Sequence, residues 1–150
     1  MPICYRKMKV TDLEAFLDLR IAQLKEEGAK SSADIRPALK EYCIRHMADD
    51  TYVAYLAMDG DSIVGTGAMS IIERPPHFAC PNGKVGIVSS MYTIKPYRRR
   101  GIAKAILALV VEEARAHGCS EVQITATDMG MLLYADFGFV QNTNYMCYRF

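Results

Sequence analysis

The stretch that decides how this chain folds is Ile94-Lys95-Pro96-Tyr97-Arg98-Arg99-Arg100-Gly101-Ile102-Ala103-Lys104. Strand-forming residues from Val85 to Ile94 precede it, and apolar residues at helical spacing follow Gly101, so the order predicts a strand, a turn and a helix. The first turn of a helix presents unpaired amides and a partial positive charge, and phosphate groups bind there. Gly101 lets the backbone approach a ligand closely, and the arginines and Lys104 add positive potential. The stretch therefore predicts a site for a phosphate or pyrophosphate.

The basic run has a second interpretation, because runs of charge are most often solvated surface. The predicted strand, turn and helix favour the phosphate site over that interpretation. The sequence contains no Gly-x4-Gly-Lys-Ser/Thr loop, and Gly65-Thr66-Gly67 lies in an expected strand without the third glycine of a dinucleotide fingerprint. Neither of these nucleotide-binding loops explains the site.

Segments on both sides of this stretch predict an α/β fold with a mixed sheet. A strand from Val85 to Ile94, a helix that ends at Gly118 and a strand from Glu121 to Thr127 form a βαβ unit, so the two strands should be parallel. A capping box from Thr11 to Glu14 marks the start of the first helix. The other expected elements are a strand from Ile3 to Met8, a helix from Asp34 to Met47, a hairpin from Thr51 to Ile72, a helix from Met129 to Phe137 and a final pair of strands from Phe139 to Phe150.

Composition narrows the class of protein. The 150 residues fit one domain, and an apolar share of 51% is typical of a globular chain. The chain has 18 basic and 17 acidic residues, and the net charge of +1 argues against a nucleic-acid partner. Five widely spaced cysteines without a CxxC pair argue against disulfides and against a thiolate metal site. No apolar run approaches the roughly 20 residues that span a bilayer, so we expect a cytoplasmic protein without a membrane segment.

Two motifs together resemble those of a known family. Arg98-Arg99-Arg100-Gly101-Ile102-Ala103 is similar to the Arg/Gln-x-x-Gly-x-Gly/Ala signature of the GNAT superfamily of N-acetyltransferases, with Ala103 in place of the commoner glycine. Leu133-Tyr134-Ala135-Asp136-Phe137-Gly138-Phe139 resembles the Leu-Tyr-x-x-x-Gly-Phe motif that follows the fifth strand in that superfamily. A helix and a strand separate the two motifs, as in the family. The resemblance is strong from Ser90 to Phe139 and weak before Tyr52.

The resemblance implies a single N-acetyltransferase domain over residues 1–150. Its fold would be a mixed, mostly antiparallel sheet with helices on both faces and a central parallel strand pair that splays to bind acetyl-CoA. Backbone groups of Met91, Tyr92 and Thr93 would pair with the pantetheine arm. The residues that would hold the pyrophosphate are Arg98, Arg99, Arg100, Gly101, Ile102, Ala103 and Lys104. Relatives are often homodimers, so we also expect a homodimer.

The resemblance further implies catalytic roles. Tyr134 matches the usual general acid, since a phenol is protonated at neutral pH and can supply a proton to a leaving thiolate; a core aromatic residue is the plainer interpretation. For the general base, the candidates are Glu73 at the end of an expected strand, His77 on the following loop, and water. No Ser/His/Asp or Cys/His signature is present, so direct transfer is favoured over a route through Cys80 or Cys119.

The predicted function is acetyl transfer from acetyl-CoA to a primary amine, first of a small molecule and second of a protein or peptide. A non-catalytic acyl-CoA-binding module would keep the basic turn and dispense with Tyr134, so the intact second motif argues against it. A nucleic-acid-binding domain built on the arginines is a third hypothesis, which the net charge and the lack of a reader motif disfavour.

Overall fold

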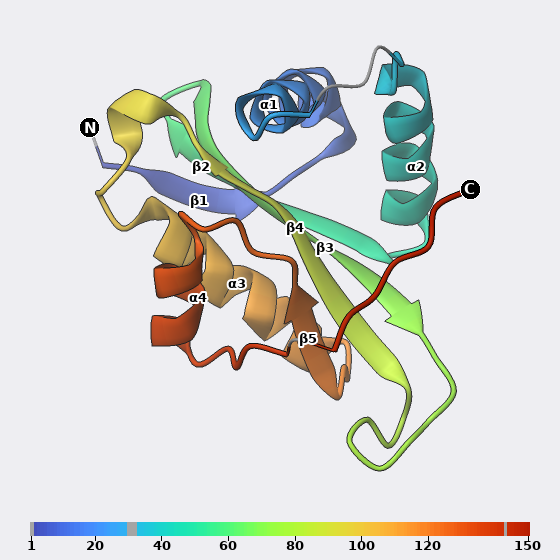
Figure 1. The fold of residues 1–150 in the computed structure, drawn as a ribbon. Coiled ribbons are helices and arrows are strands. Elements are labelled where there is room, and N and C mark those ends of the chain that lie inside the picture. Colours follow the sequence, from blue (N-terminus) through green and yellow to red (C-terminus); the bar gives the residue numbers. More distant parts are fainter. Residues whose placement is uncertain (1, 30–32, 143) are drawn as a thin grey trace.

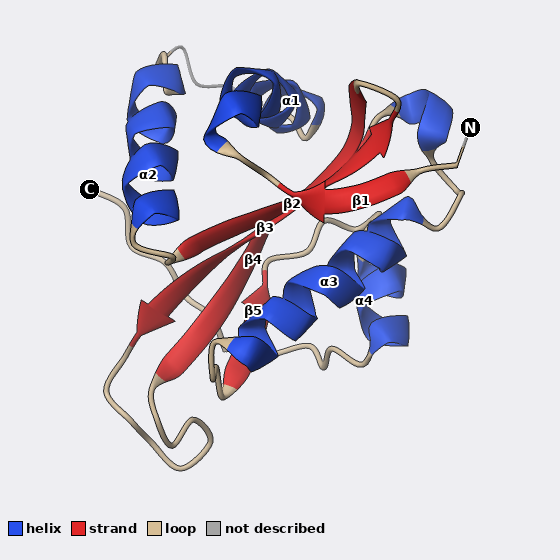
Figure 2. Cartoon of the chain, turned by 180° about the vertical axis from the view of Figure 1, so that it is seen from behind, coloured by secondary structure: helices blue, strands red, loops and turns tan. Residues whose placement is uncertain are grey.

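A computed structural model describes residues 2–29, 33–142 and 144–150 as a sheet between two layers of helices (Figure 1). Helices α1 and α2 cover one face of the sheet, and α3 and α4 cover the other (Figure 2). The elements found in the described residues are, in chain order, β1 (Cys4–Lys7), a 3-10 turn (Val10–Asp12), α1 (Leu13–Glu26), α2 (Arg36–Ala48), β2 (Tyr52–Asp59), β3 (Ser62–Glu73), β4 (Lys84–Thr93), a second 3-10 turn (Lys95–Tyr97), α3 (Ile102–Ala116), β5 (Glu121–Ile124) and α4 (Met131–Phe137).

The strands lie in the order β1-β2-β3-β4-β5. Neighbouring strands are antiparallel except β4 and β5, which are parallel. Because α3 connects these two, the predicted βαβ unit is confirmed. The apolar face of α3 is buried against the sheet, with apolar positions at helical spacing: Ile102, Ile106, Leu107, Val110 and Ala114.

The start of α1 differs from the predicted capping box. A 3-10 turn precedes the helix, and Asp12 rather than Glu14 reaches back, accepting a hydrogen bond from the Lys9 amide at 2.8 Å. Two hydrogen bonds of 2.8 Å from Arg6 on β1 also reach Asp12 and are the main reason why its pKa falls to about 2. Glu14 pairs instead with Arg36 on α2. A contact with a strand, which the local sequence does not reveal, therefore decides how the helix begins.

The end of the chain also differs from the prediction. The described part of residues 139–150, which leaves out residue 143, contains no strand. The parallel pair β4–β5 consequently lies at the edge of the sheet and not at its centre. The mixed, mostly antiparallel sheet with helices on both faces is confirmed. Strand-forming residues make a strand only where a partner edge pairs with them, and this segment runs away from β5 toward α2 (Figure 1).

All five cysteines of the chain are free thiols, and Cys43 and Cys80 are buried. Within residues 2–29, 33–142 and 144–150, no group of three or more His, Cys, Asp or Glu side chains is placed to hold a metal ion. None of the helices in these ranges has the length and apolar character needed to cross a bilayer.

Candidate active site

Strands β4 and β5 part near the middle of β4. The parallel ladder ends where Val88 faces Ile124, while β4 continues to Thr93. Just beyond this point β4 contains one more residue than the facing part of β3, and Ser90 has a left-handed conformation with φ 57°. Thr66 Oγ1 donates a hydrogen bond to the Ser90 carbonyl at 2.7 Å and holds this bulge. Since a bulge bends its strand, the second half of β4 diverges from β5 and leaves one side without a neighbouring strand.

The backbone of β4 alternates between this open side and β3. The Ile94 amide donates to Val64 O of β3 at 3.0 Å. Backbone groups of successive strand residues point to opposite sides, so those of Tyr92 also face β3, whereas those of Met91 and Thr93 face the open side. Two of the three positions expected to contact the pantetheine arm thus have backbone groups that face the open side of β4.

The turn before α3 presents a row of unpaired amides. The first hydrogen bond into α3 runs from Ala105 N to Gly101 O at 3.1 Å, and in the described chain the amides from Arg99 to Lys104 donate to no protein acceptor. Arg99 and Gly101 are both left-handed, with φ 66° and φ 79°, and they curl the backbone. Curled successive amides at the positive end of a helix attract anions. The donor set therefore fits a pyrophosphate group.

Arg98 differs from the other cations of the turn because its side chain already forms an ion pair within the protein. Its Nη2 donates to Glu26 Oε1 at 2.6 Å and its Nε donates to Thr93 O at 2.8 Å. Tyr92, 5.6 Å from Arg98 at its ring centre, donates its hydroxyl to the second oxygen of Glu26 at 2.6 Å. The hydrogen bonds from Tyr92 and then from Arg98 lower the pKa of Glu26. This cluster fastens the end of α1 to the end of β4. The cations that remain exposed beside the unpaired amides are Arg99, Arg100 and Lys104.

Tyr134 lies on α4, and only 9% of its surface is exposed. Its ring meets Phe139 edge to face at 6.0 Å and packs against Gly130, where a Cβ atom would lie 2.7 Å from the ring. Burial, and secondarily the carboxylate of Glu27, raises the pKa of the phenol, which therefore stays protonated at neutral pH. Within the described chain its hydroxyl has no hydrogen-bond partner. The phenol can therefore donate its proton to a ligand.

The C-terminal end of α1 contributes residues that the sequence analysis missed. Gln23 is only 4% exposed, and its Nε2 donates to Met91 O at 3.1 Å and to Glu27 Oε1 at 3.0 Å. Arg20 Nη1 donates to the side-chain oxygen Oε1 of Gln23 at 3.0 Å, so both the nitrogen and the oxygen of the buried side-chain amide form hydrogen bonds. Two helical turns separate Gln23 from the buried Phe16. A polar residue at this inward position was the signal in the sequence.

The structure does not bring Glu73 to this site. Glu73 is exposed and faces Lys84, the first residue of β4. Met91 lies near the other end of β4, about 20 Å away at the usual rise per residue. Because β3 and β4 are antiparallel, the last residue of β3 lies beside the beginning of β4 and not beside its end. His77, on the loop that follows Glu73, is exposed and lies on the same far side.

The sequence and fold can be placed among known proteins. Residues 13–139 match the model of the acetyltransferase (GNAT) family. The chain is 30% identical over 142 residues to aminoglycoside N(6')-acetyltransferase type 1 of Serratia marcescens, covering 92% of each chain. A crystal structure of a predicted acetyltransferase with acetyl-CoA from Clostridium acetobutylicum is 27% identical with a TM-score of 0.94, over 99% of this chain and 96% of that one. A GCN5-related N-acetyltransferase from Ralstonia eutropha JMP134 is 25% identical with a TM-score of 0.89, over 99% of both chains. The chain therefore belongs to the GNAT family and is an acetyltransferase.

Proposed function

We propose that the protein transfers the acetyl group of acetyl-CoA directly to a primary amine of a small molecule, as a single N-acetyltransferase domain. The observation that carries this proposal is the row of unpaired amides from Arg99 to Lys104, which fits a pyrophosphate beside the open side of β4. The similar structure from Clostridium acetobutylicum holds acetyl-CoA, which supports the same co-substrate here. The Serratia marcescens relative is named for an aminoglycoside, a small polyamine, which supports a small-molecule acceptor.

Acetyl-CoA supplies a thioester whose acyl group is activated for attack by an amine. The amides from Arg99 to Lys104 would hold its pyrophosphate, and the exposed cations among these residues would add to the attraction. The backbone amides of Met91 and Thr93 would donate to the carbonyls of the pantetheine arm, because the carbonyls of Met91 and Thr93 already accept hydrogen bonds from Gln23 and Arg98. Arg98 and Tyr92 act through Glu26 as positioning residues, since their side chains are already engaged by the protein.

Tyr134 holds a proton at its hydroxyl for the leaving thiolate. Its raised pKa keeps the proton in place at neutral pH, and the hydroxyl is not occupied by another described residue. General acid help of this kind is worth about 10²- to 10⁴-fold in rate. Gly130 makes room for the ring in the position that this role requires.

Glu27 is the carboxylate that we assign to the acceptor amine, in place of Glu73. It is exposed at the end of α1, so an amine in solution can reach it. Gln23 donates to both Glu27 and Met91 O, at 3.0 Å and 3.1 Å, and so ties this carboxylate to the open side of β4. The effect of Glu27 on the pKa of Tyr134 agrees with this placement. A carboxylate here binds a cationic amine and takes up the proton that the amine must lose before attack.

The protein is also proposed to work in the reducing cytoplasm. All five of its cysteines are free, and burial raises the pKa of the Cys43 thiol to about 11. A thiol held in its protonated form is a poor nucleophile, so Cys43 serves packing and not catalysis.

The first test measures thermal unfolding with acetyl-CoA, CoA, ATP and NAD in parallel. A ligand at 100 times its dissociation constant stabilises a protein by about 2.7 kcal/mol, which is roughly 5–10 °C for a domain of this size. We expect this rise with acetyl-CoA and CoA only. Release of free CoA is then followed with an aminoglycoside, an alkyl diamine and a lysine peptide. Acceleration by the peptide alone would contradict the proposal that the acceptor is a small molecule. The absence of any rise in unfolding temperature with acetyl-CoA would contradict the proposed acetyl transfer from acetyl-CoA.

A further inference from the structure

A half-buried cation on α1 has no carboxylate partner. The side chain of Arg20 donates one hydrogen bond within residues 2–29, 33–142 and 144–150, from Nη1 to Gln23 Oε1 at 3.0 Å, and in these ranges it forms no ion pair. The other half-buried arginines, Arg6, Arg36 and Arg98, each pair with a carboxylate of the protein at 2.6–2.8 Å. A partly desolvated charge is costly unless it is paired, so an anion bound to Arg20 would be stabilised there.

The sequence around Arg20 offers no carboxylate that could pair with it. Its neighbours one helical turn away are Phe16, Leu17, Gln23 and Leu24, and Gln23 is the polar one among them. The residues outside the described ranges are 1, 30–32 and 143, and they include no Asp or Glu. A partner for this guanidinium must therefore come from outside the chain.

Two interactions place the Arg20 guanidinium beside the proposed acceptor site. The Gln23 amide accepts from Arg20 on its oxygen, and its nitrogen donates to Glu27 Oε1 at 3.0 Å and to Met91 O at 3.1 Å. Burial raises the pKa of the Tyr52 phenol, and the positive charge of Arg20 acts on it in the opposite direction. The cation of Arg20 and the carboxylate of Glu27 thus flank one amide group next to the open side of β4.

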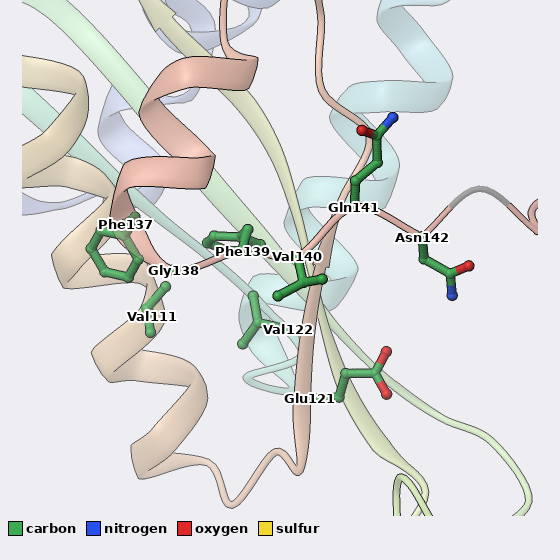
Figure 3. Close-up of a pocket in the computed structure, with 9 residues that line it drawn as sticks. All are labelled: Val111, Glu121, Val122, Phe137, Gly138, Phe139, Val140, Gln141 and Asn142. Atoms are coloured by element: carbon green, nitrogen blue, oxygen red, sulfur yellow. The ribbon is translucent and has the colours of Figure 1, made fainter.

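The hollow on the other face of the sheet is less suited to an anion. It has a volume of about 720 Å³ and lies between α3, β5 and the chain after α4 (Figure 3). Glu121 is the charged side chain among the described residues that line it. Its negative charge would repel an acid group, whereas Arg20 would attract one.

We propose that the acceptor is a small amino acid whose amine lies at Glu27 and whose carboxylate is bound by Arg20. This inference rests on the proposed transfer to a small-molecule amine, and it adds an acid group to that molecule. A guanidinium has five N–H donors in a planar arrangement that matches a carboxylate in two parallel hydrogen bonds. In the described chain one of these donors has a protein acceptor, so the others are available to a ligand.

Charge favours a carboxylate over the other groups that such a molecule could carry. One guanidinium balances the single negative charge of a carboxylate, whereas a phosphate monoester carries about −1.5 to −2 at neutral pH. A polyamine has no group that Arg20 could bind, and its positive charges would be repelled. The acceptor class therefore differs from the aminoglycoside for which the Serratia marcescens relative is named.

Matched acceptors test the acid group directly. Release of CoA from acetyl-CoA is measured with glycine, β-alanine, 4-aminobutanoate and lysine, each compared with its own carboxamide, which keeps the amine and removes the negative charge. We expect kcat/KM for at least one acid to exceed that of its carboxamide at least tenfold. Phosphoethanolamine is compared with β-alanine to separate phosphate from carboxylate. Equal rates within every pair, or a preference for phosphoethanolamine, would overturn the proposal.

Variants of α1 show whether Arg20 causes this preference. Arg20→Gln should raise KM for the preferred acid at least tenfold and leave kcat/KM for its carboxamide within about twofold, and Arg20→Lys should restore part of the loss. Lys25→Gln removes the same charge from an exposed position of the same helix and serves as the control. An equal loss for acid and carboxamide would show that Arg20 only supports Gln23, and an equal effect of Lys25→Gln would show an unspecific charge effect. Either result would overturn the inference.

Binding of acetyl-CoA separates this inference from the proposed function. Its dissociation constant, measured by calorimetry, should be the same in wild type and Arg20→Gln, because the turn before α3 is unchanged. Acetylation of amines without any preference for an acid group would leave the proposed function standing and overturn the amino acid. Absence of acetyl-CoA binding, together with no release of CoA with any amine, would overturn both.

Discussion

The turn before α3 and the C-terminal end of α1 both belong to the proposed active site, but different interactions build them. Neighbours in the sequence form the turn: two left-handed residues, Arg99 and Gly101, lead directly into the unpaired amides. The end of α1 is formed by residues far apart in the chain, since Gln23 reaches β4 and Glu26 reaches Arg98 at 2.6 Å. The difference shows that the proposed cofactor side is formed by a local sequence motif, whereas the proposed acceptor side is assembled only in the folded chain.

Removing the Tyr134 hydroxyl should have the largest effect on turnover. Tyr134→Phe is expected to lower kcat about 10²-fold, because it removes the proton donor and keeps the packed ring. The dissociation constant of acetyl-CoA, measured by calorimetry, should stay within about twofold, since the turn is unchanged. Tyr42→Phe removes a hydroxyl that bonds to Ser70 on the other face of the sheet, and it serves as the control. Equal kcat in wild type and Tyr134→Phe would remove Tyr134 from the mechanism.

Two glycines that flank α3 provide a matched test of the turn. Gly101 and Gly118 lie at opposite ends of the helix with φ 79° and φ 76°, and a Cβ atom at either would meet nothing within 4 Å. Glutamate at either position should cost a similar roughly 1–2 kcal/mol of backbone strain. Only Gly101→Glu places a negative charge beside the phosphate site, so it alone should weaken acetyl-CoA binding, by at least tenfold. Equal affinities of the two variants for acetyl-CoA would contradict the proposal that this turn binds the phosphate groups.

Substitutions of the two adjacent glutamates at the end of α1 should affect the two substrates differently. Glu27→Gln is expected to raise KM for the amine about tenfold, because a hydrogen bond to a charged group is worth about 1.5–3 kcal/mol. It should leave acetyl-CoA binding unchanged. Glu26→Gln should do the reverse, since Glu26 holds Arg98 at the cofactor turn. Steady-state kinetics with each substrate varied in turn measures both effects. A loss of acetyl-CoA affinity in Glu27→Gln would contradict its assignment to the acceptor.

The smallest effect concerns stability at the start of α1. The pKa of Asp12 is lowered from 3.8 to about 2, so its contribution to stability is present above pH 4 and is lost as the pH falls through 2. Because the Arg6 side chain is 39% exposed, solvent reduces this contribution to about 1–2 kcal/mol. Asp12→Asn should lower the free energy of unfolding by that amount at pH 7, with a difference that vanishes near pH 2. Urea titration across this range measures it, and a difference that is constant with pH would refute the ionic origin.

The sequence was sufficient to predict a structural feature where the residues that form it are contiguous. The unpaired amides of the turn before α3, the βαβ unit and the position of Tyr134 on α4 each follow from one short segment and its periodicity. The position of Glu73 was misjudged because antiparallel pairing puts the end of β3 beside the beginning of β4. The role proposed for Glu27 could not be predicted, because its link to β4 runs through the buried Gln23 and exists only after folding. The final strands were predicted from residue type, which specifies a strand only when a partner edge is available.

Glu26 connects the turn before α3 with the C-terminal end of α1. Its carboxylate binds Arg98 and Tyr92 at the cofactor turn, and its backbone continues directly into Glu27. A ligand that displaced Arg98 from Glu26 would therefore also change the surroundings of Glu27, the carboxylate proposed for the acceptor. By thermodynamic linkage such a coupling is reciprocal, so each substrate changes the affinity for the other by the same factor. The size of this coupling would then depend on Glu26 and its neighbour Glu27.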